Sequence, residues 1–286
     1  MKIVKHYRDE AALRGSFHAL AGATFGLDFE GWYQNGFWGD AYDPCSVVDG
    51  GTVVANVSVN RTDLMVSGRR VKLIQLGTVM TAPAYRNRGL IRHLMAQIEA
   101  DHKDVDGIYL FANDSVLDFY PKFGFRRGVE YGYSRQISQT GSCEMEQVPM
   151  DTPQRWAVLA DAMARSGFAD GVWMVDNPGL IFFYVSQFMR ENVYHCPRLD
   201  AWVIAEPEGS ELTIHNIFAP KNVTVDDCVA AFGEGFDHVT LGFAPADNTG
   251  YHREILREED TTLFVKGKFF DEFQQKKLRI PTLSHA

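Results

Sequence analysis

The sequence has few cysteines and no long apolar run, and each absence excludes a class of protein. Only four of its 286 residues are cysteine, at Cys45, Cys143, Cys196 and Cys228, and none has the C-x-x-C spacing of a zinc site. No apolar segment approaches the roughly 20 residues needed to span a bilayer, and the first residues lack a signal-peptide pattern. We therefore expect no metal, no disulfide framework, no membrane partner and a cytoplasmic location.

An excess of positive charge is also missing. The formal net charge is −9, with 37 acidic and 28 basic residues. A chain of this charge is repelled by nucleic acid and attracts cations such as amines. The sequence thus predicts no nucleic-acid partner, and its 45% hydrophobic content suffices for one large or two ordinary domains. It leaves the oligomeric state open.

The sequence does contain a basic turn that joins an apolar strand to an amphipathic helix at residues 79–91. Apolar residues recur at helical spacing after Gly89, at Leu90, Ile91, Leu94, Met95 and Ile98. The first N–H groups of such a helix have no partner within it, and the helix dipole favours an anion there. Arg86, Arg88 and Arg92 add cationic donors. We predict that this turn binds a pyrophosphate.

Two known phosphate loops do not fit this turn. A P-loop needs a second glycine followed by Lys-Ser or Lys-Thr, and a Rossmann turn needs G-x-G-x-x-G, whereas here Gly89 is followed by Leu-Ile. The segment Arg86-Asn87-Arg88-Gly89-Leu90-Ile91 instead resembles the Q/R-x-x-G-x-G/A loop of the GNAT superfamily of acetyltransferases. In that family the loop binds the pyrophosphate of acetyl-CoA. Ile91 departs from the pattern, since the family prefers a small residue there.

A second segment, residues 108–125, reads as a buried strand followed by a short helix. Ser115 and Asp118 have the spacing of a capping box at the helix start, and Gly124 stands where the helix would end. The segment is similar to the GNAT block that follows the fifth strand. That resemblance implies that Asn113 contacts the pantetheine arm and that Tyr120 is the general acid.

The order of elements over residues 1–138 agrees with this resemblance, which implies an α/β (α+β) fold with a mixed, mostly antiparallel sheet flanked by helices. In the family the fourth and fifth strands splay apart and admit the cofactor. Val79, Met80 and Thr81 would then pair with the pantetheine, and the N–H of Met80 or Thr81 would bind the thioester oxygen. We expect the last strand of this unit at 129–137.

The second half repeats this order without its motif. A strand at 212–220, a helix and a strand at 239–243 mirror the units around Gly89, with a last strand at 261–266. Lys221-Asn222-Val223-Thr224 contains neither glycine nor arginine, so we expect no CoA there. We predict an acetyl-CoA-binding catalytic domain at 1–138, a linker at 139–149, and a second, smaller, degenerate GNAT-like α+β domain at 150–286. An unrelated α+β domain is the alternative.

Together these features predict an N-acetyltransferase that uses acetyl-CoA and a primary amine, either a small molecule or a peptide. The family often has a glutamate base on the fourth or fifth strand, but Gln75 and Tyr109 stand there. Candidates near the acceptor lie in an aromatic and acidic segment, with Asp28, Phe29, Glu30 and Trp32 as acceptor-binding residues and Asp40 as a further carboxylate. Because a strand carboxylate is missing, a non-catalytic acyl-CoA sensor or interaction module remains the alternative function.

Overall fold

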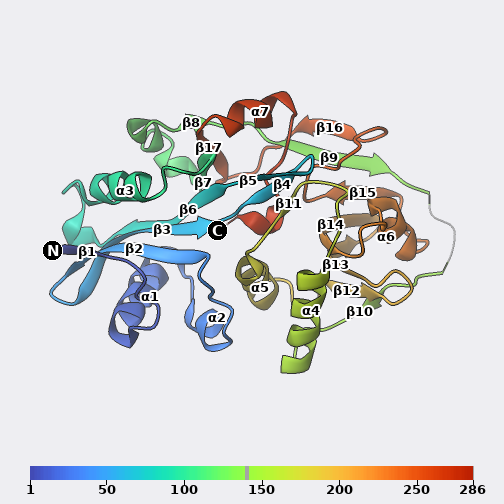
Figure 1. The fold of residues 1–286 in the computed structure, drawn as a ribbon, viewed down its shortest axis with the longest axis horizontal. Coiled ribbons are helices and arrows are strands. Elements are labelled where there is room, and N and C mark those ends of the chain that lie inside the picture. The colour runs from blue at the N-terminus through green and yellow to red at the C-terminus, as the bar shows by residue number, and fades with distance from the viewer. Residues whose placement is uncertain (139–141, 286) are drawn as a thin grey trace.

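Two seven-stranded sheets and a small three-stranded sheet form the core of the protein (Figure 1). The computed structural model describes residues 1–138 and 142–285. In spatial order the first sheet contains β1 (Lys2–Val4), β2 (Tyr42–Asp49), β3 (Thr52–Arg61), β6 (Leu73–Thr81), β7 (Gly107–Ala112), β17 (Thr262–Lys266) and β8 (Arg126–Arg127). Only the β6–β7 pair is parallel. The sheet is therefore mixed and mostly antiparallel, as predicted.

Helices cover both faces of the first sheet because its strands alternate between two apolar sets. Residues such as Val47, Val57 and Leu76 face α3 (Leu90–Asp101), which buries Leu94 and Ile98 against them. On the opposite face α1 (Ala11–Phe25) and α2 (Glu30–Gln34) pack as an aromatic layer. Figure 1 shows α3 on one side of β3 and β6 and the two earlier helices on the other. The predicted acceptor residues lie on the face toward α1 and α2.

The second sheet repeats the plan of the first. Its strands, in spatial order, are β10 (Glu146–Gln147), β12 (Val193–Cys196), β13 (Ala201–Glu208), β14 (Glu211–Phe218), β15 (His238–Leu241), β9 (Tyr131–Gln136) and β16 (His252–Ile255). Again a single pair, β14–β15, is parallel, and α6 (Val225–Ala231) connects it as α3 connects β6 to β7. The predicted internal repeat is thus present in the topology, with a shorter crossover helix.

Each sheet, however, contains a strand from the other half of the chain. The sequence places 129–137 in the first sheet and 261–266 in the second, and both assignments are wrong. Strand β9 pairs with β15 and β16, whereas β17 pairs with β7 and β8. The two strands have similar lengths, six and five residues, and the local pattern of a strand does not tell which sheet receives it. The predicted boundary at residue 138 therefore does not separate the two sheets.

The division into units 1–138 and 150–286 stays a prediction. Of the predicted linker, residues 139–141 lie outside the described residues, and the remainder includes β10.

The remaining helices are α4 (Pro153–Arg165), α5 (Pro178–Gln187) and α7 (Phe269–Gln275). The small sheet consists of β11 (Trp173–Met174), β4 (Leu64–Val66) and β5 (Arg69–Val71). Short 3₁₀ turns lie at η1 (Pro83–Tyr85), η2 (Asp114–Val116), η3 (Tyr120–Phe123) and η4 (Thr282–Ser284).

Helix α5 ties the second half of the chain to the first. Asn177 caps this helix through Leu180 N–H at 3.1 Å, and its side-chain amide donates to Asn60 Oδ1 on β3 at 2.9 Å. Trp32 Nε1 donates to the carbonyl of Gly179 at 2.8 Å. A Cβ at Gly179 would lie 2.4 Å from a carbonyl oxygen of Phe37, so only glycine permits this approach of α5 to the segment after α2.

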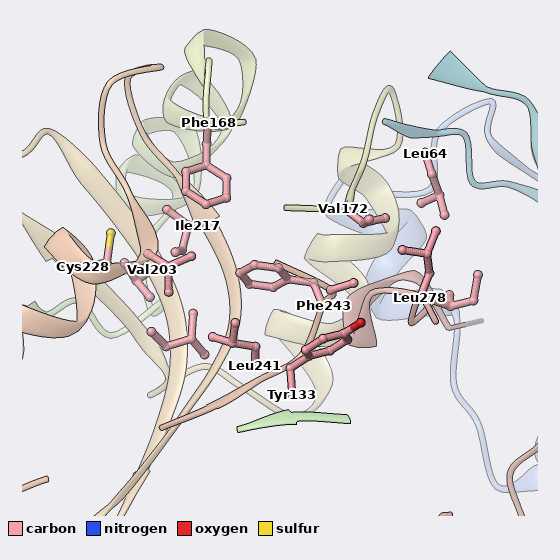
Figure 2. Close-up of a cluster of buried hydrophobic side chains, with 14 of the residues drawn as sticks. Leu64, Tyr133, Phe168, Val172, Val203, Ile217, Cys228, Leu241, Phe243 and Leu278 are labelled. Atoms are coloured by element: carbon pink, nitrogen blue, oxygen red, sulfur yellow. The ribbon is translucent and has the colours of Figure 1, made fainter. Parts of the chain in front are cut away.

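The second sheet packs into a core that also contains residues of the first sheet, such as Leu73 and Tyr109, and Figure 2 shows part of it. Tyr133 from β9 lies there with Leu241 and Phe243, and Val172 and Leu64 belong to the same cluster, to the right of Phe243 in Figure 2. Because Tyr133 belongs to β9, the exchanged strand is a component of this core and not an edge addition.

We predict that the exchange makes the two sheets unfold together. Phe264 on β17 is fully buried, so Phe264→Ala should destabilise the protein by about 3–5 kcal/mol. In native-state hydrogen exchange, amides of β13 and β14 should lose protection in parallel with those of β3. Phe188→Ala, at a side chain that is 62% exposed, is the control and should change little. Loss of protection confined to the first sheet would instead support two independent domains.

Candidate functional site

The candidate site begins where strand β6 leaves its neighbour β7. The ladder between them runs from Leu73↔Gly107 to Gln75↔Tyr109, although β6 continues to Thr81. On its other edge β6 stays paired with β3 as far as Thr81↔Ala55. Within the described chain, residues 76–81 of β6 thus have one edge without a ladder to β7. The backbone groups on such an edge are available to a ligand.

A β-bulge marks the point of divergence. The register between β3 and β6 shifts between Asn56 and Ser58, and Thr78 has φ of 46°, in the left-handed region. A β-branched residue rarely adopts this conformation. One extra residue in β6 bends the strand and increases its twist. The bulge therefore separates the part of β6 that pairs with β7 from the predicted cofactor edge at Val79, Met80 and Thr81.

The predicted pyrophosphate turn lies at the end of this edge. Asn87 and Gly89 both have positive φ, 61° and 73°, and Gly89 is the N-cap of α3 without a side-chain cap. The N–H groups of the first helical turn therefore have no partner within the helix. A Cβ at Gly89 would meet no atom within 4 Å, so the space in front of the helix is open. Leu90 and Ile91 are half-buried and pack against the core beneath α3.

Three arginines surround this helix start. Arg88 donates to the carbonyl of Ala84 at 2.7 Å and lies over the ring of Tyr85, while Arg92 lies over the ring of Phe123. Arg86 contacts the carbonyl of Thr81 at 3.4 Å. All three side chains are exposed, and none forms an ion pair with a carboxylate in the described residues. The turn thus keeps the positive charge that an anion needs.

Asn113 follows β7 and already has a partner. Its Nδ2 donates to the Asp260 carboxylate at 2.8 Å, and the N–H of Asp114 donates to the other oxygen at 2.7 Å. The helix predicted to begin at Ser115 with a capping box is wrong, since two 3₁₀ turns, η2 and η3, stand in its place. Asp260 satisfies the N–H at the start of η2. Gly124 does end η3, with φ of 80°.

Tyr120 is the first residue of η3, so Pro121 occupies a position where a missing N–H is tolerated. The ring of Tyr120 packs on Phe119, Phe125 and Phe264, on the face of the sheet that α3 covers. Burial raises the pKa of its phenol to about 12. The group is therefore protonated at neutral pH and can donate a hydrogen bond.

The four predicted acceptor residues fall into two groups. Phe29 and Trp32 are buried in the aromatic layer with Trp38, where they support α1 and α2. Asp28 accepts from the N–H of Glu30, the first residue of α2, at 2.8 Å. Glu30 contacts Arg14 Nε and His18 Nδ1, both at 3.2 Å, and hydrogen bonds from Gln34 and Arg14 lower its pKa. Asp40 forms an ion pair with Arg8.

Sequence reasoning missed the C-terminal segment, which returns to β7. Tyr109 Oη donates to the carbonyl of Ser284 at 2.8 Å, and the His285 ring stacks on Phe111 at 3.8 Å between centroids. Phe111 lies two residues beyond the last β6–β7 pair. No local pattern in the last residues predicts this contact, because its partners are more than 170 residues away.

The second unit lacks an open helix start. At α6 the Thr224 hydroxyl accepts from Asp227 N–H at 3.1 Å, and the Asp227 carboxylate accepts from Thr224 N–H, which together form a capping box. Asp170 accepts from Val225 N–H at 3.0 Å. At the start of α6 the carboxylates of Asp170 and Asp227 therefore bind the N–H groups whose counterparts at the start of α3 have no side-chain cap.

A cleft of about 440 Å³ lies elsewhere, between α2, α4 and α5, and is lined in part by Phe37, Trp156, Phe182 and Arg190. It contains none of the predicted site residues, so we do not assign it to the reaction. Among the described residues no group of three or more His, Cys, Asp or Glu could hold a metal ion. None of their helices is both long and apolar enough to cross a membrane.

Comparison with known proteins agrees with this geometry. Residues 19–128 match the family model for the acetyltransferase (GNAT) domain. A probable N-acyltransferase of unknown function from Enterococcus faecalis V583 superposes with a TM-score of 0.61 at 14% identity, over 93% of this chain and 71% of that one. Eis1 from Mycobacterium abscessus gives 0.56 at 15% identity, over 92% and 73% of the two chains.

A GCN5-related N-acetyltransferase from Kribbella flavida gives a TM-score of 0.53 at 18% identity, over 92% of this chain and 70% of that one. A comparison with curated proteins gave no match. Residues 19–128 therefore match a GNAT acetyltransferase domain, and the solved structures share the fold over nearly the whole length of the chain.

The C-terminal segment also buries an acid, which gives a pH prediction. Glu130 accepts from Ile280 N–H at 2.8 Å, with the Arg279 and Glu258 charges nearby, and burial raises its pKa to about 7. Between pH 4.5 and 7 the folded state holds a proton that the unfolded chain releases, so stability should fall as pH rises through this range.

We expect Glu130→Gln to remove most of this slope and to be more stable than wild type at pH 8. Thermal unfolding at several pH values measures it, with the exposed Glu208→Gln as control. A mutant that keeps the wild-type slope would show that another group causes it.

Proposed function

We propose that the protein transfers an acetyl group from acetyl-CoA to a primary amine, by direct attack of the amine on the thioester. The observation that carries this proposal is the unpaired edge of β6, which leads to a helix start that is open and surrounded by arginines. The shape and charge of that surface suit a long donor with a pyrophosphate at one end. Acetyl-CoA supplies the activated acyl group.

The chain's own groups would have the following roles. Arg86, Asn87, Arg88, Gly89, Leu90, Ile91 and Arg92 would hold the pyrophosphate through N–H groups and guanidinium charge. Val79, Met80 and Thr81 would pair with the pantetheine arm, and an N–H of Met80 or Thr81 would donate to the thioester oxygen as negative charge develops there. Asn113 would contact the arm through its carboxamide, in competition with Asp260.

The reaction forms one C–N bond and breaks the C–S bond, so the amine loses a proton and sulfur leaves as thiolate. A thiol has a pKa of about 8.5, well below that of about 12 for Tyr120, so complete proton transfer from the phenol is uphill. We assign Tyr120 the role of hydrogen-bond donor to the leaving sulfur, which gains a proton from water. The proton of the amine also leaves through water.

Acceptor class and compartment are part of the same proposal. The net charge of −9 favours a cationic acceptor. Asp28 is exposed just before α2 and Glu30 is the first residue of α2, where their carboxylates would attract one, with Phe29 and Trp32 as the aromatic support. All four cysteines are free thiols, which is typical of proteins in the reducing cytoplasm.

A second candidate function is an acyl-CoA sensor without catalysis. It is favoured by Gln75 and Tyr109, which stand where a strand base would, and by the Asp260 carboxylate on Asn113. Release of CoA thiol with 2-phenylethylamine, spermidine, glucosamine and tri-alanine separates the two functions. A rate above the rate of hydrolysis with any of these amines supports the enzyme.

We predict that Gly89→Asp abolishes acetyl-CoA binding because it places a side chain and a negative charge in front of α3. Acetyl-CoA at about a hundred times its Kd should stabilise the wild type by roughly 2.7 kcal/mol in thermal unfolding. Gly68→Asp is the matched control, since Gly68 has φ of 76° and equally open space but lies in the β4–β5 hairpin. No shift in the wild type would contradict the proposed donor.

Tyr120→Phe should lower kcat by about 10²-fold and leave the thermal shift with acetyl-CoA unchanged, because only the donor to the leaving sulfur is lost. Steady-state kinetics with the best of the four amines measures this. An unchanged kcat would remove Tyr120 from the mechanism.

A further inference from the structure

Three hydroxyl groups meet at the bulge of β6. Tyr42 Oη on β2 lies 2.5 Å from Thr78 Oγ1 and 2.9 Å from Ser58 Oγ on β3. Thr78 Oγ1 and Ser58 Oγ are 3.0 Å apart, so the three oxygens form a closed triangle. The triangle lies on the face of the sheet toward α1 and α2, opposite to α3, because Tyr42 belongs to the aromatic layer.

A buried amide fixes this triangle from behind. Asn56 Nδ2 donates to Ser58 Oγ and to the Thr78 carbonyl, both at 2.9 Å. Its Oδ1 accepts from Ser46 Oγ at 2.8 Å, and Ser46 bonds in turn to Tyr7 Oη at 2.6 Å. Tyr7, Ser46, Asn56 and Ser58 are all fully buried. Because Asn56 Oδ1 accepts from Ser46, the nitrogen of the same amide must face Ser58, and Ser58 Oγ accepts a hydrogen bond from it.

Counting protons and lone pairs shows what remains free. The Tyr42 and Thr78 hydroxyls both donate to Ser58 Oγ, so the protons of these two groups are used within the triangle. Ser58 Oγ also accepts from Asn56 Nδ2. Tyr42 is only 6% exposed. Thr78 is half-buried and keeps one lone pair, with no proton to donate outward.

The position of Thr78 gives this lone pair a role. It lies between Gln75, the last residue of β6 that pairs with β7, and Val79, where the proposed pantetheine edge begins. A donor that extends from the turn at Gly89 back along Thr81, Met80 and Val79 brings its thioester to the bulge. A group that approaches the thioester from the face of α1 and α2 meets Thr78 Oγ1.

We propose that Thr78 Oγ1 accepts a hydrogen bond from the attacking amine and so positions it against the thioester. The inference rests on the proposed function and assigns the acceptor subsite that it lacks. A neutral primary amine has two N–H groups and one lone pair, so it can donate to Thr78 and direct its lone pair to the carbonyl carbon. Tyr42, Ser58 and Asn56 are positioning residues that keep Thr78 an acceptor.

Thr78 is not the base in this proposal. Burial raises the pKa of Tyr42 to about 12, and the amide of Asn56 passes no proton onward, so the network has no outlet for one. The site therefore selects acceptors that present an N–H. A quaternary ammonium compound, which has none, should bind without using Thr78.

The test compares Thr78→Val, which keeps the β-branched shape, with Thr78→Ser, which keeps the hydroxyl. With the most active of the four probe amines, Thr78→Val should raise the KM of the amine about tenfold and leave the KM of acetyl-CoA and the thermal shift unchanged. Thr78→Ser should stay within about twofold of wild type. Tyr42→Phe removes the hydroxyl that donates to Ser58 and lies 2.5 Å from Thr78 Oγ1, so it should loosen Thr78 and raise the amine KM with little change in kcat.

A wild-type amine KM in Thr78→Val overturns the proposal, and so does a defect in Thr78→Ser as large as that in Thr78→Val. Inhibition by the N,N,N-trimethyl derivative of the same amine should be equal in wild type and Thr78→Val, and unequal inhibition also contradicts it. If the wild type turns over none of the amines, the proposed function itself fails. If the wild type is active and the Thr78→Val variant is equally active, only the role of Thr78 fails.

Discussion

Strand β6 is held by β3 along one edge and released by β7 along the other, and the candidate site depends on this asymmetry. The ladder with β3 keeps residues up to Thr81 extended, while the bulge at Thr78 bends the strand away from β7. A lost ladder leaves backbone N–H and C=O groups without partners, which is costly unless a ligand or water satisfies them. Strand β7 is in turn stabilised on its far edge by β17, so that the gap does not detach it from the sheet.

The second sheet shows the same plan without a gap for a ligand. There the ladder between β14 and β15 ends at Ile214↔Leu241, but Gly242 N–H continues to Ile214 at 2.7 Å and the Thr282 N–H of η4 bonds to Gly242 at 2.7 Å. The start of α6 is closed by Asp170 and Asp227. One topology thus leaves an open strand edge in one unit and a continued hydrogen-bond ladder in the other, and the difference lies in which segment fills the divergence.

Local patterns predicted the elements whose hydrogen bonds are local. The turn at Gly89 opens α3 as its pattern predicts, and Thr152 and Thr224 cap α4 and α6 through hydrogen bonds to residues three positions further along. Where the partner is distant, the prediction was wrong. Asp260 replaces the capping box expected at Ser115, although it lies 146 residues from the N–H that it binds. The exchange of β9 and β17 has the same origin.

Helix α5 and the hydroxyl triangle escaped prediction for different reasons. Residues 179–185 are apolar on all sides, so they show no helical period, and the helix is buried accordingly. Thr78, Ser58 and Tyr42 come from three strands and become neighbours only in the sheet. The assignments of Tyr120, Asn113 and the residues on α2 stay predictions, which the kinetic experiments test.

The exchange of strands also sets the time at which the protein can complete its folding during synthesis. Strand β7 ends at Ala112, yet its partner β17 begins only at Thr262. At about 5–20 residues per second, a ribosome takes about 8–30 s to make the chain between them. For that period the nascent first sheet exposes an unpaired apolar edge, a template for pairing with other chains. The pairing of β7 with β17 therefore comes late in synthesis, long after the other strands of the first sheet have been made.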